Sequence, residues 1–529
     1  MNDNLKGKFD YTARVLDRTE FCDLSDDYTL PDYMPAIGRV ISCTATAAPP
    51  EIYLGSGSIE FAGGVRYLLH YESADDSTLW CAELPSEYDH LISADKIPNL
   101  PSSPSDITEL VHPDVESINA RITAPRRLTI KSKVRLEIDI SCTAGFESIF
   151  NGDTEDTNAL RYLEASSPYG INSCGTCAPI ILRDKIALTE LGLSDSDGCR
   201  VISSRAKVTI NRTEINESSI ECRGEVNACM IYTSESENDR PRRITRKIPF
   251  SADIPVTALP SVSASSIGVR AYGVCPSITA TLNEDGINLE TAIVISAESS
   301  WISSLTYIKD IYSQHAKCEL SKSLVELHIP IACFNGNATI SAQSKLDAIG
   351  LDGSMKLLDY YAIVLPNTEW EITDSGKFIL TGKMKISAIA DNGVELNSAE
   401  FESDFKYTAE IPNAKSAQSP KVNVIADISD IKCRLDSDRI YADCELYVSV
   451  LAEDEKKISA ISEIYMTSLP SADKSRSRII VCYPSKGETL WDIAKRYRSD
   501  AADIAEKNSL SVTSPDSTES LAKIKFLII

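Results

Sequence analysis

The sequence lacks the features of a secreted, membrane-spanning or nucleic-acid-binding protein. The N-terminus has no apolar run of the kind found in signal peptides. No stretch approaches the roughly 18 apolar residues that are needed to cross a bilayer. Basic residues are few, since 53 Lys and Arg stand against 77 Asp and Glu, for a net charge of −24. Binding to nucleic acid phosphates requires clustered Lys and Arg, so we expect no nucleic acid partner. Because no apolar stretch is long enough, we also expect no membrane insertion. The expected location is cytoplasmic.

Catalytic signatures are also missing. The five histidines are widely separated, and none stands in a His-Glu-x-x-His motif. The sequence contains neither a Gly-x-Ser-x-Gly elbow nor a Gly-x-x-x-x-Gly-Lys-Ser/Thr phosphate loop. Carboxylates are so abundant that their proximity in sequence does not indicate a glycosidase pair. We therefore expect no catalytic residues, no enzyme activity and no cofactor.

Cysteine, in contrast, is plentiful, with 15 residues. Without a visible signal peptide these should be reduced thiols, and most lie in strand-like runs, where cysteine acts as a small hydrophobic residue. The exception is the pair Cys174 and Cys177, which are separated by Gly-Thr. Two such thiols could form a redox pair or supply half of the ligands of a zinc site. No second Cys-x-x-Cys pair and no neighbouring histidine supplies the remaining zinc ligands. We favour two thiols in a turn, with a metal site as the weak alternative.

The chain is too long for one core and predicts three or four domains. Six strand-like segments with apolar residues at every second position recur along it. In the first set the central position is Gly63, Gly224 and Gly382, at intervals of 161 and 158 residues. A second set, starting at Leu128, Ile287 and Ile440, interleaves with the first. Alternation of this kind predicts sheets buried on one face, and the small central residue indicates a bulge or the close approach of another sheet. Recurrence predicts three tandem β-sandwich-like repeats.

The last fifty residues have a different pattern, that of strand, helix, helix and strand. Val481 and Tyr483 alternate with polar neighbours, as in a half-buried strand. Thr489, followed three residues later by Asp492, forms a capping-box-like pair that begins a helix. Asp500 is placed to cap a second helix. The sequence therefore predicts a mainly β chain that ends in a small α/β (βααβ) module.

This C-terminal module resembles a LysM domain, because Gly487–Tyr497 reads Gly-Glu-Thr-Leu-Trp-Asp-Ile-Ala-Lys-Arg-Tyr. The resemblance implies a ligand groove between two loops. The corresponding residues are Gly487, Glu488, Thr489 and Leu490 in the first loop, and Asn508, Ser509 and Leu510 in the second. Backbone N–H groups at a helix N-terminus would suit the N-acetyl group of a sugar or a peptide carbonyl. Trp491 is either core or groove wall. Further possible partner contacts are Lys495, Arg496 and Arg498.

The preceding repeats resemble the DUF3794 family of sporulating Firmicutes. The motif that opens a family domain matches Leu30-Pro-Asp-Tyr-Met-Pro-Ala-Ile-Gly-Arg-Val-Ile41, and a later one matches Ile308-Lys-Asp-Ile-Tyr-Ser313. The second copy is eroded near residues 160–166. The expected domains are 10–147, 148–300 and 301–468, followed by a linker at 469–477, which should let the tail move independently, and the LysM domain at 478–529.

DUF3794 domains followed by LysM are similar in order and length to the SipL-type spore-coat morphogenetic proteins. The resemblance implies a non-enzymatic coat assembly factor in the mother cell, at the forespore surface. Its LysM module would bind the coat-basement morphogenetic ATPase. The alternative is a protein that binds peptidoglycan or chitin oligomers, with N-acetylglucosamine as ligand. The usual Pro-Gly-Gln after Leu510 is replaced by a longer polar segment, which alters one wall of a glycan groove.

Overall fold

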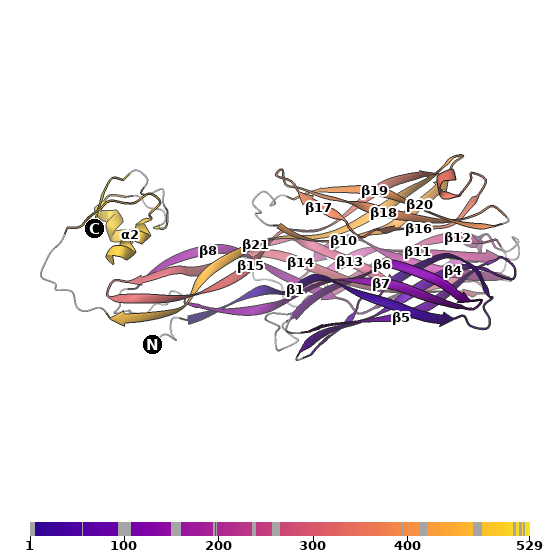
Figure 1. The fold of residues 1–529 in the computed structure, drawn as a ribbon, viewed down its shortest axis with the longest axis horizontal. Coiled ribbons are helices and arrows are strands. Elements are labelled where there is room, and N and C mark those ends of the chain that lie inside the picture. Colours follow the sequence, from indigo (N-terminus) through magenta and orange to yellow (C-terminus); the bar gives the residue numbers. More distant parts are fainter. Residues whose placement is uncertain are drawn as a thin grey trace.

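The protein is an elongated β body that narrows into a stem, with a small helical module at the end of the stem (Figure 1). The computed structural model describes residues 6–55, 57–93, 107–149, 160–193, 196, 198–234, 240–256, 265–393, 395–411, 420–468, 479–510, 515–517, 521 and 524–529. The expectation of a mainly β chain is confirmed. No helix among these residues is long and apolar enough to cross a membrane.

The body consists of three successive units, each built from two antiparallel sheets. In unit 1, β1, β7 and β6 form one sheet, and β2, β4, β3 and β5 form the other. A core of buried side chains from both sheets lies between them. The strands of unit 1 are β1 (Lys6–Thr29), β2 (Ile37–Ala47), β3 (Glu51–Leu54), β4 (Ser58–Ser73), β5 (Leu79–Ser93), β6 (Ile107–Ala124) and β7 (Arg127–Ile149).

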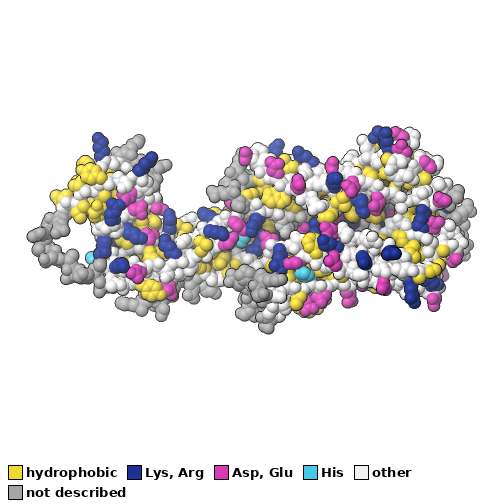
Figure 2. All heavy atoms as spheres, viewed as in Figure 1, with side chains coloured by type: hydrophobic (Ala, Val, Ile, Leu, Met, Phe, Trp, Pro, Cys, Tyr) yellow, Lys and Arg dark blue, Asp and Glu magenta, His cyan; other side chains and the backbone are white. Residues whose placement is uncertain are grey.

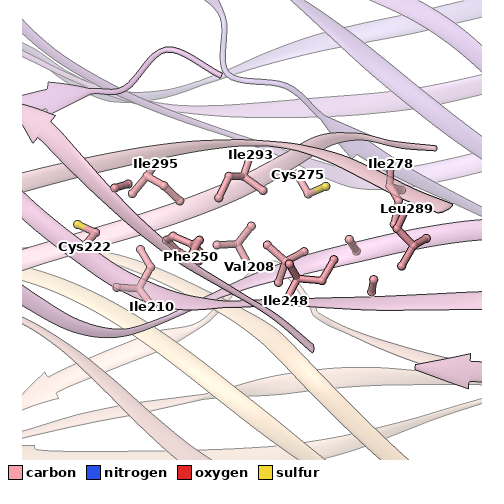
Figure 3. Packing of buried hydrophobic residues seen from close by; sticks show 14 of the residues in the cluster. Val208, Ile210, Cys222, Ile248, Phe250, Cys275, Ile278, Leu289, Ile293 and Ile295 are labelled. Atoms are coloured by element: carbon pink, nitrogen blue, oxygen red, sulfur yellow. The ribbon is translucent and has the colours of Figure 1, made fainter. Parts of the chain in front are cut away.

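Unit 2 also has two sheets, but here the four-stranded one holds the first and last strands of the unit, because β9 pairs with β14: β13, β14, β8 and β9 form one sheet, and β10, β11 and β12 form the other. Figure 3 shows side chains from its two sheets, among them Val208, Phe250 and Ile293, meeting in a shared core. The elements of unit 2 are β8 (Leu160–Thr176), β9 (Ile180–Ala187), α1 (Leu188–Leu191), β10 (Cys199–Ile215), β11 (Ser219–Ser234), β12 (Arg242–Pro255), β13 (Ser265–Asn283) and β14 (Gly286–Ser313).

Unit 3 pairs β15, β21 and β20 in one sheet and β16, β18, β17 and β19 in the other. Its elements are β15 (Ala316–Lys345), the 3-10 helix Asp347–Ile349, β16 (Lys356–Val364), β17 (Glu369–Ile372), β18 (Lys377–Asp391), β19 (Leu396–Glu410), β20 (Pro420–Leu435) and β21 (Arg439–Ser468). The boundary expected between residues 300 and 301 falls inside β14, and units 2 and 3 instead meet at the turn before β15. That the three units are copies of one repeat stays a prediction.

The six predicted alternating segments are the central strands of these six sheets. The first set lies on β4, β11 and β18, and the second on β7, β14 and β21, each flanked by strands on both sides. Their apolar positions are buried, as Ile59, Val226 and Leu446 illustrate. A strand in the middle of a sheet with one face on a core gives the cleanest alternation, which is why the sequence pattern was strongest there.

The central glycines of the first set are covered by aromatic rings from the neighbouring strand. Gly63 on β4 stands directly opposite Tyr88 on β5. A Cβ at Gly63 would lie 2.4 Å from the Tyr88 ring, and one at Gly382 would lie 2.9 Å from Phe405. Gly224 differs, because a Cβ there would lie 2.0 Å from the Thr209 carbonyl oxygen on β10, next to a register shift between Ile210 and Arg212, and 2.9 Å from the Phe250 ring. The expectation was a bulge or the close approach of another sheet: a register shift lies opposite Gly224, whereas the atoms that cover Gly63 and Gly382 include rings from an adjacent strand of the same sheet.

Replacing Gly63 with alanine is expected to lower the free energy of unfolding by about 1–3 kcal/mol, the usual cost of overpacking a core. The Tyr88 ring cannot move away freely, because its hydroxyl donates to the Ala48 carbonyl at 2.7 Å. The matched control is Gly64→Ala on the same strand, where an added Cβ would meet only the Ser86 carbonyl at 3.9 Å. Thermal unfolding should separate the two variants, and equal midpoints would contradict the explanation.

The stem is formed by the first and last strands of each unit. These pair as three antiparallel ribbons, β1 with β7, β8 with β14, and β15 with β21. At about 3.3 Å per residue, the 30 residues of β21 extend about 100 Å. The ribbons pack together around buried Ile149, Ile311 and Ile464, one from each unit. The three units are thus joined along the stem by a shared apolar core.

Charged side chains are buried where the three units meet. Arg270 on β13 is 1% exposed and binds Glu298 on β14, with 2.7 Å between Nε and Oε2. Its Nη1 donates to Asn423 on β20 at 2.8 Å. Arg14 on β1 contacts Asp139 on β7 at 3.2 Å and Glu453 on β21 at 2.7 Å. Two guanidinium groups and three carboxylates therefore connect units 1, 2 and 3.

Candidate functional site at the C-terminal module

The C-terminal module, residues 479–529, has the predicted order of strand, helix, helix and strand. Its elements are β22 (Val481–Cys482), α2 (Leu490–Tyr497), α3 (Ala501–Lys507) and β23 (Leu527–Ile528). The two short strands pair antiparallel, with Cys482 opposite Leu527. Both of these side chains are buried, in a core that includes Ile493 and Ile504 from the two helices.

The start of α2 confirms the predicted capping box. The Thr489 hydroxyl accepts from the Asp492 N–H at 3.1 Å, and the Asp492 carboxylate accepts from the Thr489 N–H at 3.0 Å. The next donor is also used, because the Trp491 N–H donates to the Pro515 carbonyl at 2.9 Å. Two of the N–H groups expected to receive a ligand at this helix terminus are therefore satisfied within the module.

The other predicted residues of the first loop have mixed environments. Gly487 is exposed and has a φ of +85°, a conformation that favours glycine. Glu488 forms an ion pair with Arg496, and its carboxylate also accepts from the Ser485 N–H at 3.0 Å. Leu490 is fully buried in the module core. Of this loop, Gly487 is the position most open to a ligand.

In the second loop, Asn508 has a structural contact on each side. Its amide donates to the carbonyls of Ile504 and Ile528, each at 2.7 Å, and its side-chain oxygen accepts from the Ile528 N–H at 2.8 Å. These bonds tie the end of α3 to β23. Ser509 is exposed, with a φ of +52°, and the Leu510 N–H donates to the Ala505 carbonyl. Ser509 is therefore the exposed residue of this loop.

The module is docked on the tip of the β8–β14 ribbon, through α2. The Trp491 indole donates to Asp310 on β14 at 2.8 Å, and the Lys495 ammonium contacts the same carboxylate at 2.6 and 2.7 Å. The rings of Trp491 and Tyr312 meet edge to face, 4.8 Å apart. Trp491 is 4% exposed. It is neither groove wall nor solely module core, because the stem covers it.

Further contacts surround this docking site. The Tyr312 hydroxyl donates to the Ser499 carbonyl at 2.6 Å, and burial raises the pKa of Tyr312 to about 12, so the donor is retained. Lys309 pairs with Asp516 at 2.6 Å, a bond that raises the pKa of Lys309.

The linker expected at 469–477 lies outside the described residues. The tail expected to move independently is instead held against the stem.

Two of the three predicted cations have local partners. Lys495 binds Asp310 on the stem, and Arg496 binds Glu488. Arg498 is the residue after α2 and adopts a left-handed conformation, with a φ of +55°. Lys495 and Arg496 are therefore both already paired with carboxylates of this chain.

An exposed apolar face on the module was missed from the sequence. Val481 and Tyr483 were expected on the buried side of their strand, but Cys482 is buried and Tyr483 is 72% exposed. The helices cover one face of this two-stranded sheet, so the alternate residues of both strands face outward. The exposed large apolar side chains here are Ile479, Ile480, Val481, Tyr483, Phe526 and Ile528. Figure 2 shows hydrophobic side chains gathered on the module.

The cysteine pair is distant from this module. Cys174 lies near the end of β8, where its thiol contacts the Glu109 carbonyl at 3.7 Å, and Cys177 accepts from the Ile295 N–H at 3.2 Å. Burial raises the pKa of both thiols, which disfavours the thiolate that a metal needs. All 15 cysteines are free thiols. Within the described ranges no group of three or more His, Cys, Asp or Glu is arranged to hold a metal.

Comparison with known proteins identifies one family in this chain. The LysM domain model matches residues 485–516, which include α2, α3 and both predicted groove loops. No curated protein and no solved structure matches the chain. The C-terminal module therefore contains a LysM domain, a family associated with the binding of peptidoglycan and other N-acetylglucosamine-containing glycans.

Proposed function

We propose that this chain is a non-enzymatic assembly scaffold whose LysM domain binds a protein partner. The observation that carries the proposal is the exposed apolar face of β22 and β23. Large contiguous apolar patches on protein surfaces mark interaction sites, and aromatic side chains are enriched at protein interfaces. Tyr483 and Phe526 supply two such side chains here.

The setting that we propose is the spore envelope, with the coat-basement morphogenetic ATPase as partner at the forespore surface. The proposed setting and partner rest on the resemblance of residues 30–41 and 308–313 to the DUF3794 family. The acidic β body would serve as a spacer that carries the LysM domain at one end. A rigid, extended shape suits a scaffold, because it separates a recognition surface from the rest of the chain.

A second candidate is glycan binding through the two loops that contain Gly487 and Ser509. The observation that favours it is the LysM match itself, together with the exposure of both residues. The N–H groups of Trp491 and Asp492, however, already have partners within the module. A glycan would therefore have to bind through other groups of these loops.

The test is retention of the full chain on two baits, the coat-basement ATPase of the same organism and peptidoglycan with chitin oligomers. We expect retention on the protein, reduced about tenfold or more by Tyr483→Ser with Phe526→Ser, since tenfold corresponds to only 1.4 kcal/mol. The matched control is Tyr465→Ser, which removes an exposed tyrosine from β21 in the stem. Retention on glycan alone, lost with Ser509→Tyr but not with the apolar-face variant, would establish the second candidate instead.

A further inference from the structure

The interface between the LysM domain and the ribbon tip has an apolar centre. Leu163 and Tyr312 of unit 2 belong to the same buried cluster as Leu490, Trp491 and the rest of the module core. Tyr312 and Trp491 are both 4% exposed. Two large aromatic side chains are thus withdrawn from water at this contact, which is the composition of a specific protein interface.

Three charged contacts surround that centre. On the tip, Arg161, Lys309 and Asp310 present two positive charges and one negative charge. On the module they meet Asp500, Asp516 and Lys495, which present the opposite signs. Asp310 and Lys495 are joined at 2.6 Å, and Asp310 also accepts from the Trp491 indole. Complementary pairs of this kind fix the register of an interface and reject wrong partners.

The two sides of this interface share no strand and no described backbone hydrogen bond. The tip belongs to unit 2, whereas the module follows unit 3 and is joined to it through residues 469–478. Every described polar contact across the interface uses at least one side chain. Such a contact has the same geometry whether the module comes from its own chain or from a neighbouring one.

We infer that the tip of the β8–β14 ribbon also binds the LysM domain of a second copy of this chain. The tip is the one ligand that the described structure shows for the α2 face, so a second copy carries a partner that fits it. Each copy has one tip and one module, and a reciprocal exchange closes into a twofold dimer. Intramolecular docking competes with this exchange and keeps isolated chains mostly monomeric. High local concentration, as on an assembling surface, favours the exchange by mass action.

This inference goes beyond the proposed function, because it uses a different face of the module. The exchange uses α2, through Trp491 and Lys495. The proposed partner uses the outer face of β22 and β23, through Tyr483 and Phe526. Failure of one interaction therefore leaves the other unaffected.

The test is complementation between two full-length variants. Asp310→Lys alters the tip and leaves the module intact, whereas Lys495→Glu alters the module and leaves the tip intact. Each variant alone places like charges in contact and should sediment as a 57.8 kDa monomer. In an equal mixture, the intact module of the first chain meets the intact tip of the second, and the two altered surfaces also match in charge. We expect a species of twice the monomer mass only in the mixture.

The control mixture combines Lys507→Glu with Asp374→Lys, two charge reversals at exposed positions away from the interface, and should stay monomeric. A second complementing pair, Lys309→Glu with Asp516→Lys, tests the same interface through more exposed side chains. A 19F-tryptophan spectrum of each single variant should show that only the Trp491 signal moves, which establishes that the module is released and the body folded. Released modules with no dimer in either mixture would overturn the inference, and the bait experiment would be unaffected.

Discussion

Replacing Arg270 with methionine is expected to lower the free energy of unfolding of the β body by about 3–5 kcal/mol, because removing one partner of a buried ion network leaves the others uncompensated. Arg270 is almost completely buried and contacts Glu298, Asp139 and Asn423. Without it, Arg14 alone would face three carboxylates. Burial already raises the pKa of Asp139 above its ordinary value, and the loss of Arg270 should raise it further.

The measurement is urea unfolding of the full chain, compared with Arg183→Met. Arg183 forms a surface pair with Glu290 on the same unit and is largely exposed, so its loss should change stability by less than about 1 kcal/mol. A triple variant that adds Asp139→Asn and Glu298→Gln to Arg270→Met should recover much of the stability, since two fewer carboxylates then remain. If Arg270→Met behaved like Arg183→Met, the network would not hold the three units together.

Acidification from pH 7 to pH 4 is expected to destabilise the wild-type body through His70. This side chain on β4 is 1% exposed and lies between Ser42 Oγ, 3.2 Å from Nδ1, and Ser203 Oγ of unit 2, 2.8 Å from Nε2. Burial lowers the pKa of His70 to about 4, and Arg205 opposes protonation further, while Asp359 favours it. The unfolded chain therefore takes up a proton near pH 6.5, where the folded chain does not.

The direction in which stability changes with pH follows from this difference in protonation between the folded and unfolded states. Because His70 binds a proton in the unfolded state but not in the folded state between about pH 6.5 and pH 4, its contribution to stability falls as the pH falls through this window, by about 3 kcal/mol. Asp139 acts in the opposite direction, since its raised pKa gives stability that is lost as pH rises. The readout is therefore the difference between variants, in which the contribution of Asp139 cancels.

Thermal unfolding at pH 7 and pH 4 should show a smaller acid-induced decrease in His70→Gln than in the wild type. The control is His315→Gln, whose side chain is exposed in the turn before β15 and which should keep the wild-type pH dependence. An identical pH dependence in all three proteins would show that His70 does not titrate differently on unfolding.

Features that depend on local sequence were predictable. The alternation that starts at Leu128 and at Ile440 predicted strands with one buried face, because the pattern is carried by consecutive residues of the strand itself. The capping box of Thr489 and Asp492 was readable for the same reason, since its two partners are three residues apart. The LysM motif is likewise local, and the family comparison supports it.

Features that depend on contacts between distant parts of the chain could not be predicted from the sequence. Nothing near Lys495 indicates that its partner is Asp310, 185 residues earlier. The outward direction of Val481 and Tyr483 depends on which side the helices cover, and a strand of two residues gives too little alternation to decide it. Arg270 was not recognised as a core residue either, because an arginine is buried only when partners from other strands neutralise it. The structure shows the position and the contacts of each predicted groove residue, but their role as a ligand site stays a prediction.

The stem determines the order in which the chain can complete its fold during synthesis. Each ribbon joins the first and last strands of a unit, so Lys6 on β1 pairs with Ile149 on β7. A growing chain must therefore emerge through the whole of a unit before its ribbon can close. A chain that stops before β21 would leave the 30 residues of β15 without their partner strand. Such a long open edge invites pairing with other chains, so truncated products are expected to aggregate and not to persist as shorter scaffolds.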